Sequence, residues 1–295
     1  MRKILVVTDP EFSNEVVLNR IKEVPKEDTL FRIEHYLAAT SAKDGSAFST
    51  ALQEKQKWLD DLVAPLIADG FKIEIRVQAY AKLHEAIIAS ALDFGADYVF
   101  KPLRHHSNLR RVLYTSTDWN LIRFCPCPLL LVSANEAVHG KAVLATLDLE
   151  TRDAPHQKLN EIVLERSKAL AGLVEGQVHI ASAYNTVTVA SGNTSLDPLQ
   201  YNVLKGARDE HLKKGKAIAE SNEIAPDNVH LGEGAPEVVV NEIANSIDAG
   251  IIVLGTVART GVSGMFIGNT AESVMESVNV DVFVVKQRDF VTPVK

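Results

Sequence analysis

Short, wholly apolar runs alternate along this chain with longer segments in which apolar residues recur every three or four positions. Residues 46–68 show the second pattern most clearly, with apolar side chains at i, i+3, i+4, i+7 and i+8: Leu59, Leu62, Val63, Leu66 and Ile67. This spacing predicts a helix with one apolar stripe. Residues 251–254 are apolar at every position, which is typical of a parallel strand covered on both faces. The alternation of the two patterns predicts a doubly wound α/β fold.

The pattern predicts strands and helices in the same order in each half of the chain. In the first half the strands are 3–8, 30–37, 71–77, 97–101 and 128–132, and the helices are 13–23, 46–68, 82–93 and 115–124. In the second half the strands are 142–147, 177–183, 227–231, 250–254 and 281–286, and the helices are 156–173, 200–220, 235–247 and 269–277.

The two halves also match in sequence. Three pairs of strand segments correspond in the same order: 4–9 with 143–148, 96–101 with 250–255, and 128–132 with 282–286. Matched segments in matched order indicate an internal duplication. We expect two tandem domains, 1–134 and 141–295, joined by a short polar linker.

Composition limits the partners and the location of the protein. The chain has 295 residues, of which 46% are hydrophobic and 23% charged, so it can form a substantial core. Its formal charge of -7 provides no broad basic surface, and we expect no nucleic-acid partner. No segment approaches the ~20 apolar residues of a membrane helix, so we expect a cytoplasmic protein with no membrane partner.

The metal-binding residue types are sparse. Cys125 and Cys127 are the two cysteines, and they are separated by a proline. This spacing is poorly suited to disulfide geometry, and no second pair completes a thiolate site, so we expect buried structural thiols. His105 and His106 are adjacent but have no visible third ligand. We therefore expect no metal.

Three segments of the second half are expected at the carboxyl edge of its sheet, where open parallel sheets bind ligands. Asp148 follows the first strand, and its carboxylate is interpreted either as a turn cap or as a contact to a ribose; Asp9 has the same place in the first half. Residues 232–237 follow the third strand and contain Pro236, which indicates a helix start that lines the pocket only with backbone.

The glycine-rich segment 255–272 follows the fourth strand. Within it, Gly268, Asn269 and Thr270 precede a predicted helix, whose free N–H groups and positive dipole end suit an anion. The alternative is that Asn269 or Thr270 caps the helix without a ligand.

With these motifs the chain resembles the universal stress protein family, in particular its tandem E-type branch, and residues 232–285 are the most specific stretch. The resemblance implies two five-stranded parallel sheets packed as an internal pseudo-dimer. It also implies a role in stress survival rather than in a metabolic reaction, with no catalytic residue assigned.

ATP-binding members of that family carry Gly-x2-Gly-x9-Gly-Ser/Thr. The corresponding positions here are Gly255, Ala258, Gly268 and Asn269, so two of the four differ, although Thr270 follows directly. The methyl group of Ala258 stands where a backbone would approach phosphate. The resemblance therefore implies that the second half binds ATP or a related nucleotide weakly, or another phosphate-bearing ligand.

The first half departs further from this motif. By the same alignment its positions are Lys101, Arg104, Tyr114 and Thr115, without glycine, and residues 104–111 form a basic loop. That loop is interpreted either as an anion or partner contact, or as a solvated loop paired with acidic residues. We expect no ordinary phosphate site in this half.

Three functions are compared. The first is a binding module whose ligand alters the association of the protein with its partners. Its phosphates would be held by Gly255, Gly268, Asn269 and Thr270, and its ribose by Asp148. The second is a scaffold without nucleotide that acts through surfaces such as the edge strand at 283–286. The third is a slow ATP hydrolase, which the absence of a Gly-Lys-Ser/Thr motif disfavours. The duplication leaves open whether the chain replaces a homodimer or assembles further as a homo-oligomer or with a protein partner.

Overall fold

The computed structural model describes residues 1–9, 14–39, 45–105, 112–133, 137–151, 153–184, 198–256 and 269–294. The elements of the first half are β1 (Arg2–Val7), α1 (Glu15–Lys22), β2 (Thr29–Ala38), α2 (Gly45–Ala68), β3 (Lys72–Tyr80), α3 (Leu83–Phe94), β4 (Tyr98–Pro102), β5 (Arg104–His105), β6 (Val112–Leu113), α4 (Ser116–Phe124) and β7 (Leu129–Val132). Those of the second half are β8 (Ala142–Thr146), α5 (Ala154–Val174), β9 (Val178–Tyr184), α6 (Pro198–Ser221), the 3-10 turn η2 (Pro226–Asn228), β10 (Val229–Glu233), α7 (Pro236–Ser246), β11 (Ala249–Thr256), α8 (Asn269–Ser277) and β12 (Asp281–Lys286).

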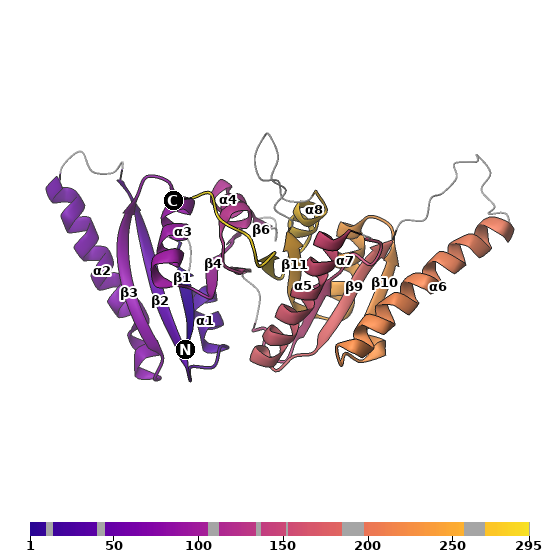
Figure 1. The fold of residues 1–295 in the computed structure, drawn as a ribbon. Helices are drawn as coiled ribbons and strands as arrows, with labels where there is room; N and C mark the ends of the chain where they lie inside the picture. The colour runs from indigo at the N-terminus through magenta and orange to yellow at the C-terminus, as the bar shows by residue number, and fades with distance from the viewer. Residues whose placement is uncertain are drawn as a thin grey trace.

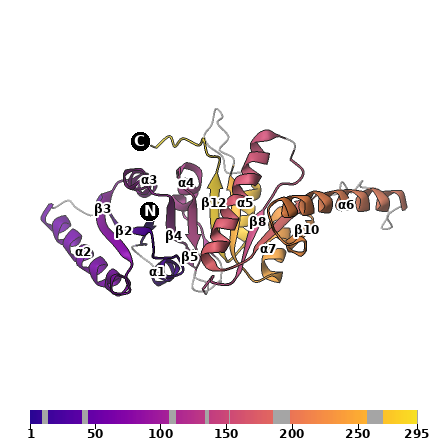
Figure 2. The same cartoon turned by 60° about the horizontal axis from the view of Figure 1, so that its bottom comes forward.

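Ten strands form one continuous sheet in the order β10-β9-β8-β11-β12-β7-β4-β1-β2-β3. The five strands of each half are parallel to one another, and the halves join through the antiparallel pair β12–β7. Figure 1 shows the two halves side by side, with α2 and α6 toward the outer ends, and Figure 2 shows the same arrangement from another direction. The expected fold, two doubly wound five-stranded units packed as a pseudo-dimer, is confirmed. The domain limits 1–134 and 141–295 remain our proposal.

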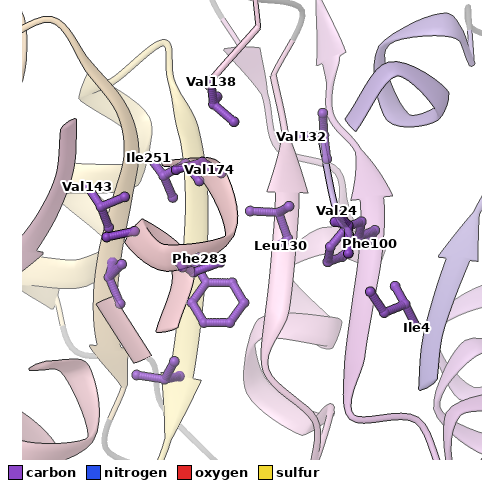
Figure 3. Packing of buried hydrophobic residues seen from close by; sticks show 14 of the residues in the cluster. Ile4, Val24, Phe100, Leu130, Val132, Val138, Val143, Val174, Ile251 and Phe283 are labelled. Atoms are coloured by element: carbon purple, nitrogen blue, oxygen red, sulfur yellow. The ribbon is translucent and has the colours of Figure 1, made fainter. Parts of the chain in front are cut away.

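The pseudo-two-fold axis passes through the pair Leu130 and Phe283. These residues face each other in the β7–β12 ladder, and the neighbouring pairs are symmetric about them. Figure 3 shows their side chains on adjacent strands at the centre of the core. The interface is therefore isologous, as in a two-fold dimer. Because β12 pairs with β7 inside the chain, the expectation that 283–286 is a free edge for a partner is wrong.

The sheet register corrects the alignment of the two halves by one residue. Ile4 and Val143 are equivalent, and they pair with Tyr98 and Ile251, so Tyr98 corresponds to Ile251. Lys101 therefore corresponds to Leu254, not to Gly255. The same shift of one residue aligns α4 with α8, which are both nine residues long, so that Thr115 corresponds to Gly268 and Ser116 to Asn269. Side chains alternate between the two faces of a sheet, so a slip of one residue would assign each side chain of the strand to the wrong face.

Two apolar clusters cover the two faces of the sheet across both halves. One contains side chains of α1, α2, α5 and α6, including the central residues Leu130 and Phe283. The other contains side chains of α3, α4, α7 and α8. Strands buried on both faces explain the runs that are apolar at every position.

A buried ionic contact also joins the halves. Arg20 Nε of α1 lies 2.7 Å from Asp281 Oδ2 at the start of β12, and Asp281 Oδ1 accepts hydrogen bonds from the Ser133 N–H and hydroxyl. Burial raises the pKa of the Asp281 carboxyl, and Arg20 opposes that shift. Truncating one member of such a pair would leave an uncompensated charge in the core.

Cys125 is buried and Cys127 is half-buried, and both are free thiols. Cys127 Sγ lies 3.0 Å from the Ala96 carbonyl oxygen. Within the part of the chain that the structure describes, no helix combines the length and apolar character needed to cross a bilayer.

Candidate functional site

The carboxyl ends of β8 and β11, with the start of α8, form the edge at which the second-half site was expected. β8 and β11 are neighbouring parallel strands, so Asp148 and the end of β11 share this edge. Thr270 lies exposed in the first turn of α8. Ala258, Gly268 and the side chain of Asn269 lie outside the described residues.

Asp148 is held by its own neighbours and by α5. Its N–H lies 3.2 Å from Asn160 Oδ1, and its carbonyl oxygen accepts a 2.8 Å hydrogen bond from Asn160 Nδ2. Its Oδ1 accepts from the backbone N–H groups of Glu150 and Thr151, each at 3.0 Å. Asp148 Oδ1 thus caps the turn that follows β8, as one of the two interpretations of this residue predicts. Oδ2 has no hydrogen-bond partner among the described residues, and the Asp148 residue is exposed.

Gly255 is required by packing. A Cβ atom on this glycine would lie 2.6 Å from Cγ of Leu159 on α5, which is closer than carbon atoms approach without displacement. Gly232 has a similar role, because its Cβ would lie 2.5 Å from Val239 on α7. α7 begins at Pro236, so the segment 232–237 is a helix start, as the sequence indicates.

His211 of α6 lies close to this edge, and sequence reasoning missed it. Its Nε2 lies 3.3 Å from Ser182 Oγ at the end of β9, and its ring packs on Tyr184 with centroids 5.4 Å apart. Burial lowers the pKa of His211, while the charges of Glu150 and Asp148 oppose that change. No local pattern signalled this residue, because α6 and β9 meet only through the tertiary fold.

A cleft is present at the equivalent edge of the first half. Its volume is about 430 Å³, and its lining includes Asp9, Tyr80, Lys82, His84 and Lys101, together with the first residues of α4. His84 Nδ1 lies 3.4 Å from Asn120 Nδ2, and burial lowers the pKa of His84. The sequence predicted no ligand site here, so the cleft itself is a finding of the structure. Residues 106–111 of the basic loop lie outside the described residues.

Lys101, which lines this cleft, forms a buried ion pair with Asp118 at the start of α4. Lys101 Nζ lies 2.8 Å from Asp118 Oδ1. Asp118 Oδ2 accepts hydrogen bonds from the Thr115 N–H at 2.6 Å and from the Thr115 hydroxyl at 2.7 Å. Asp118 N–H lies 3.3 Å from Thr115 Oγ1, which completes a capping box. The N-cap donors of Thr115 and the Lys101 ammonium are thus engaged by Asp118 from within the chain.

A second cavity, of about 460 Å³, opens at the opposite, amino edge of the second-half sheet. Its lining includes Asn241 and Asn245 of α7 and the ion pair of Lys141 with Asp248. Although it is slightly larger than the first-half cleft, it lies away from the carboxyl edges where Asp9 and Asp148 stand. We do not assign the ligand site to it.

The fold is a tandem pair of five-stranded α/β units about an internal two-fold axis, and residues 1–133 and 156–286 match the universal stress protein family. The chain belongs to this family. Universal stress protein E of Escherichia coli K12 is 34% identical over 247 residues, which cover 83% of this chain and 78% of that protein.

A solved structure with a similar fold covers nearly the whole chain. A functionally unknown protein of Pseudomonas aeruginosa PAO1 is 26% identical, with a TM-score of 0.77, over 98% of this chain and 93% of its own. A universal stress protein crystallised in complex with cAMP aligns with 49% of this chain and 95% of its own, at 18% identity and a TM-score of 0.30. The bound cAMP is described for that protein.

Proposed function

We propose that this stress protein binds a phosphate-bearing ligand, with a nucleotide as the expected class, at the carboxyl edge of its second half, and that the ligand alters association with a protein partner or a second copy. The observation that supports this most directly is the Asp148 carboxylate. It is exposed at the end of β8, its main chain is held on both sides by Asn160, and its Oδ2 has no partner among the described residues.

The chemistry of the edge suits two parts of such a ligand. The first turn of α8 supplies backbone N–H groups and the positive end of a helix dipole for phosphate, near Gly268, Asn269 and Thr270. The Asp148 carboxylate can accept hydrogen bonds from sugar hydroxyls. Gly255 contributes the close packing of β11 on α5 that supports this edge. Because Ala258 and Asn269 depart from the family motif, the affinity should be modest.

A charge placed at the start of α8 tests the proposal without weakening the helix. Asn269→Asp adds a negative charge where the helix dipole favours it, so the fold should be as stable as before or slightly more stable. The same charge repels phosphate, and we expect the affinity for ATP, measured by calorimetry, to fall about tenfold or more. Gly268→Asp should act in the same direction. Ser116→Asp, at the equivalent position of α4, is the matched control and should leave the affinity unchanged.

The rival functions give different results in the same experiments. A scaffold without nucleotide would show no heat of binding and no ATP-dependent shift of the melting temperature. A hydrolase would release phosphate from ATP at a rate that Asp148→Ala lowers. Sedimentation with and without ATP measures the association. Equal ATP affinity in the wild type and in Asn269→Asp would rule out the proposed second-half site.

A further inference from the structure

At one pair of contacting buried positions, among other differences, the first half carries charges and the second half does not. Where the first half has Lys101 on β4 and Asp118 on α4, the corrected register places Leu254 on β11 and Ala271 on α8. All four are buried, with exposed fractions of 3% and 0% in the first half and 4% and 6% in the second. The next inward-facing positions of the two helices agree with this alignment. Leu121 of α4 corresponds to Val274 of α8, and both are buried.

The apolar pair shows that the fold does not need a charge at this place. A buried ion pair must compensate the loss of hydration of both groups, and hydrocarbon of similar volume is often as stable or more stable. In the second half Leu254 and Ala271 belong to the apolar cluster that α7 and α8 form on the sheet. The first half therefore keeps Lys101 and Asp118 at a site where the same architecture also accommodates two aliphatic side chains.

Asp118 is positioned as an anion at the start of a helix. Its carboxylate receives the Thr115 N–H, the Thr115 hydroxyl and the Lys101 ammonium, at 2.6, 2.7 and 2.8 Å. These are the kinds of donors that bind phosphate at a helix N-terminus. α8 carries Ala271 at the position of Asp118, so its first turn has no carboxylate of its own at that position.

We propose that Lys101 and Asp118 decide which half binds the ligand: the Asp118 carboxylate, neutralised by Lys101, takes the place of the ligand's phosphate at α4, so that the chain binds a single phosphate-bearing ligand, in its second half. The inference rests on the function proposed above for the second half. In the first half, the cleft of about 430 Å³ therefore has a helix start whose N-cap donors, the N–H and hydroxyl of Thr115, are already engaged by Asp118.

A reciprocal exchange between the halves tests this proposal, with ATP as the probe and calorimetric stoichiometry as the measurement. Lys101→Leu combined with Asp118→Ala gives the first half the residues of the second. We expect this variant to bind one more ATP than the wild type, two in place of one. Leu254→Lys combined with Ala271→Asp gives the second half its own internal anion, and we expect it to lose ATP binding at least tenfold.

The outcomes separate this inference from the proposed function. A wild type that binds two ATP, or a first-half variant that still binds one, overturns the role of Lys101 and Asp118 while the second-half site stands. A wild type that binds none, with a first-half variant that binds one, removes the second-half site and supports the role of the pair. No binding by either protein overturns both. Lys101→Met with Asp118→Asn, which keeps the size of both side chains, replaces the first-half variant if that one does not fold, and the same outcomes apply to it.

Discussion

Asn160 holds Asp148 by its main chain at two points, with Oδ1 3.2 Å from the Asp148 N–H and Nδ2 2.8 Å from the Asp148 carbonyl oxygen. Asn14 makes the same two contacts to Asp9 in the first half, at 2.7 and 3.1 Å. The separation along the chain is 12 residues in one half and 5 in the other. The same clamp is therefore built from different local sequences, and it fixes where each aspartate leaves the sheet edge.

Removal of the second-half clamp should weaken both stability and ligand binding. Asn160→Ala deletes two hydrogen bonds to the main chain, and we expect a loss of about 1–3 kcal/mol in the free energy of unfolding. Because the Asp148 carboxylate would no longer be held in one place, we expect the affinity for ATP to fall by roughly a factor of 3–10. Chemical denaturation and calorimetry measure the two effects.

Asn14→Ala is the matched control in the first half. It should cost a similar amount of stability, because it removes the equivalent pair of hydrogen bonds. It should leave the ATP affinity unchanged. A loss of affinity of the same size in both variants would mean that the clamp acts only through overall stability.

Gly255→Ala should destabilise the protein through packing. The new Cβ would lie 2.6 Å from Leu159 Cγ, so either β11 or α5 must shift, at a cost of about 1–3 kcal/mol. We expect Leu159→Ala to relieve this clash, so that the double variant loses less stability than the sum of the single ones. Additive stability losses would contradict the packing role.

His35 should make stability fall in mild acid. Its Nδ1 lies 2.8 Å from Thr8 Oγ1, and Thr8 donates its own proton to the Glu34 carbonyl oxygen, so Nδ1 carries the hydrogen and Nε2 is the acceptor. Nε2 is buried without a partner among the described residues. Burial, together with the charge of Lys55, lowers the pKa of His35 to about 4, against the opposing charge of Asp9.

The sign of this effect follows from proton binding. Between the ordinary pKa of ~6.5 and the lowered value, the unfolded chain binds a proton that the folded protein does not, so stability is present at neutral pH and is lost as the pH falls. From pH 7.5 to pH 5 the His35 contribution to the loss should be about 2 kcal/mol. His35→Gln keeps a hydrogen-bond donor for Thr8 but does not titrate. Denaturation at both pH values should show a smaller loss in this variant, and an equal loss would contradict the assignment.

The order of strands and helices, the duplication and the doubly wound class are all determined by the sequence, because they follow from local periodicity and from runs of apolar residues. The equivalence of Asp9 and Asp148 is visible for the same reason, since each ends an apolar strand. Which residue of one half corresponds to which residue of the other is not determined by these local patterns. Local patterns around residues 96–101 fit two registers, and only pairing with β1 and β8 shows that Lys101 corresponds to Leu254.

Contacts between distant segments were decided by tertiary structure alone. The antiparallel pairing of β7 with β12 converts an expected free edge into the centre of the sheet. The clamp by Asn160 and the ion pair of Lys101 with Asp118 each join elements through side chains, at separations that leave no periodic signal. Periodicity records which face of an element is buried, whereas the partner across that face is set by how the elements pack. The chemistry of the first-half cleft and of the second-half carboxyl edge therefore appears only in the folded chain.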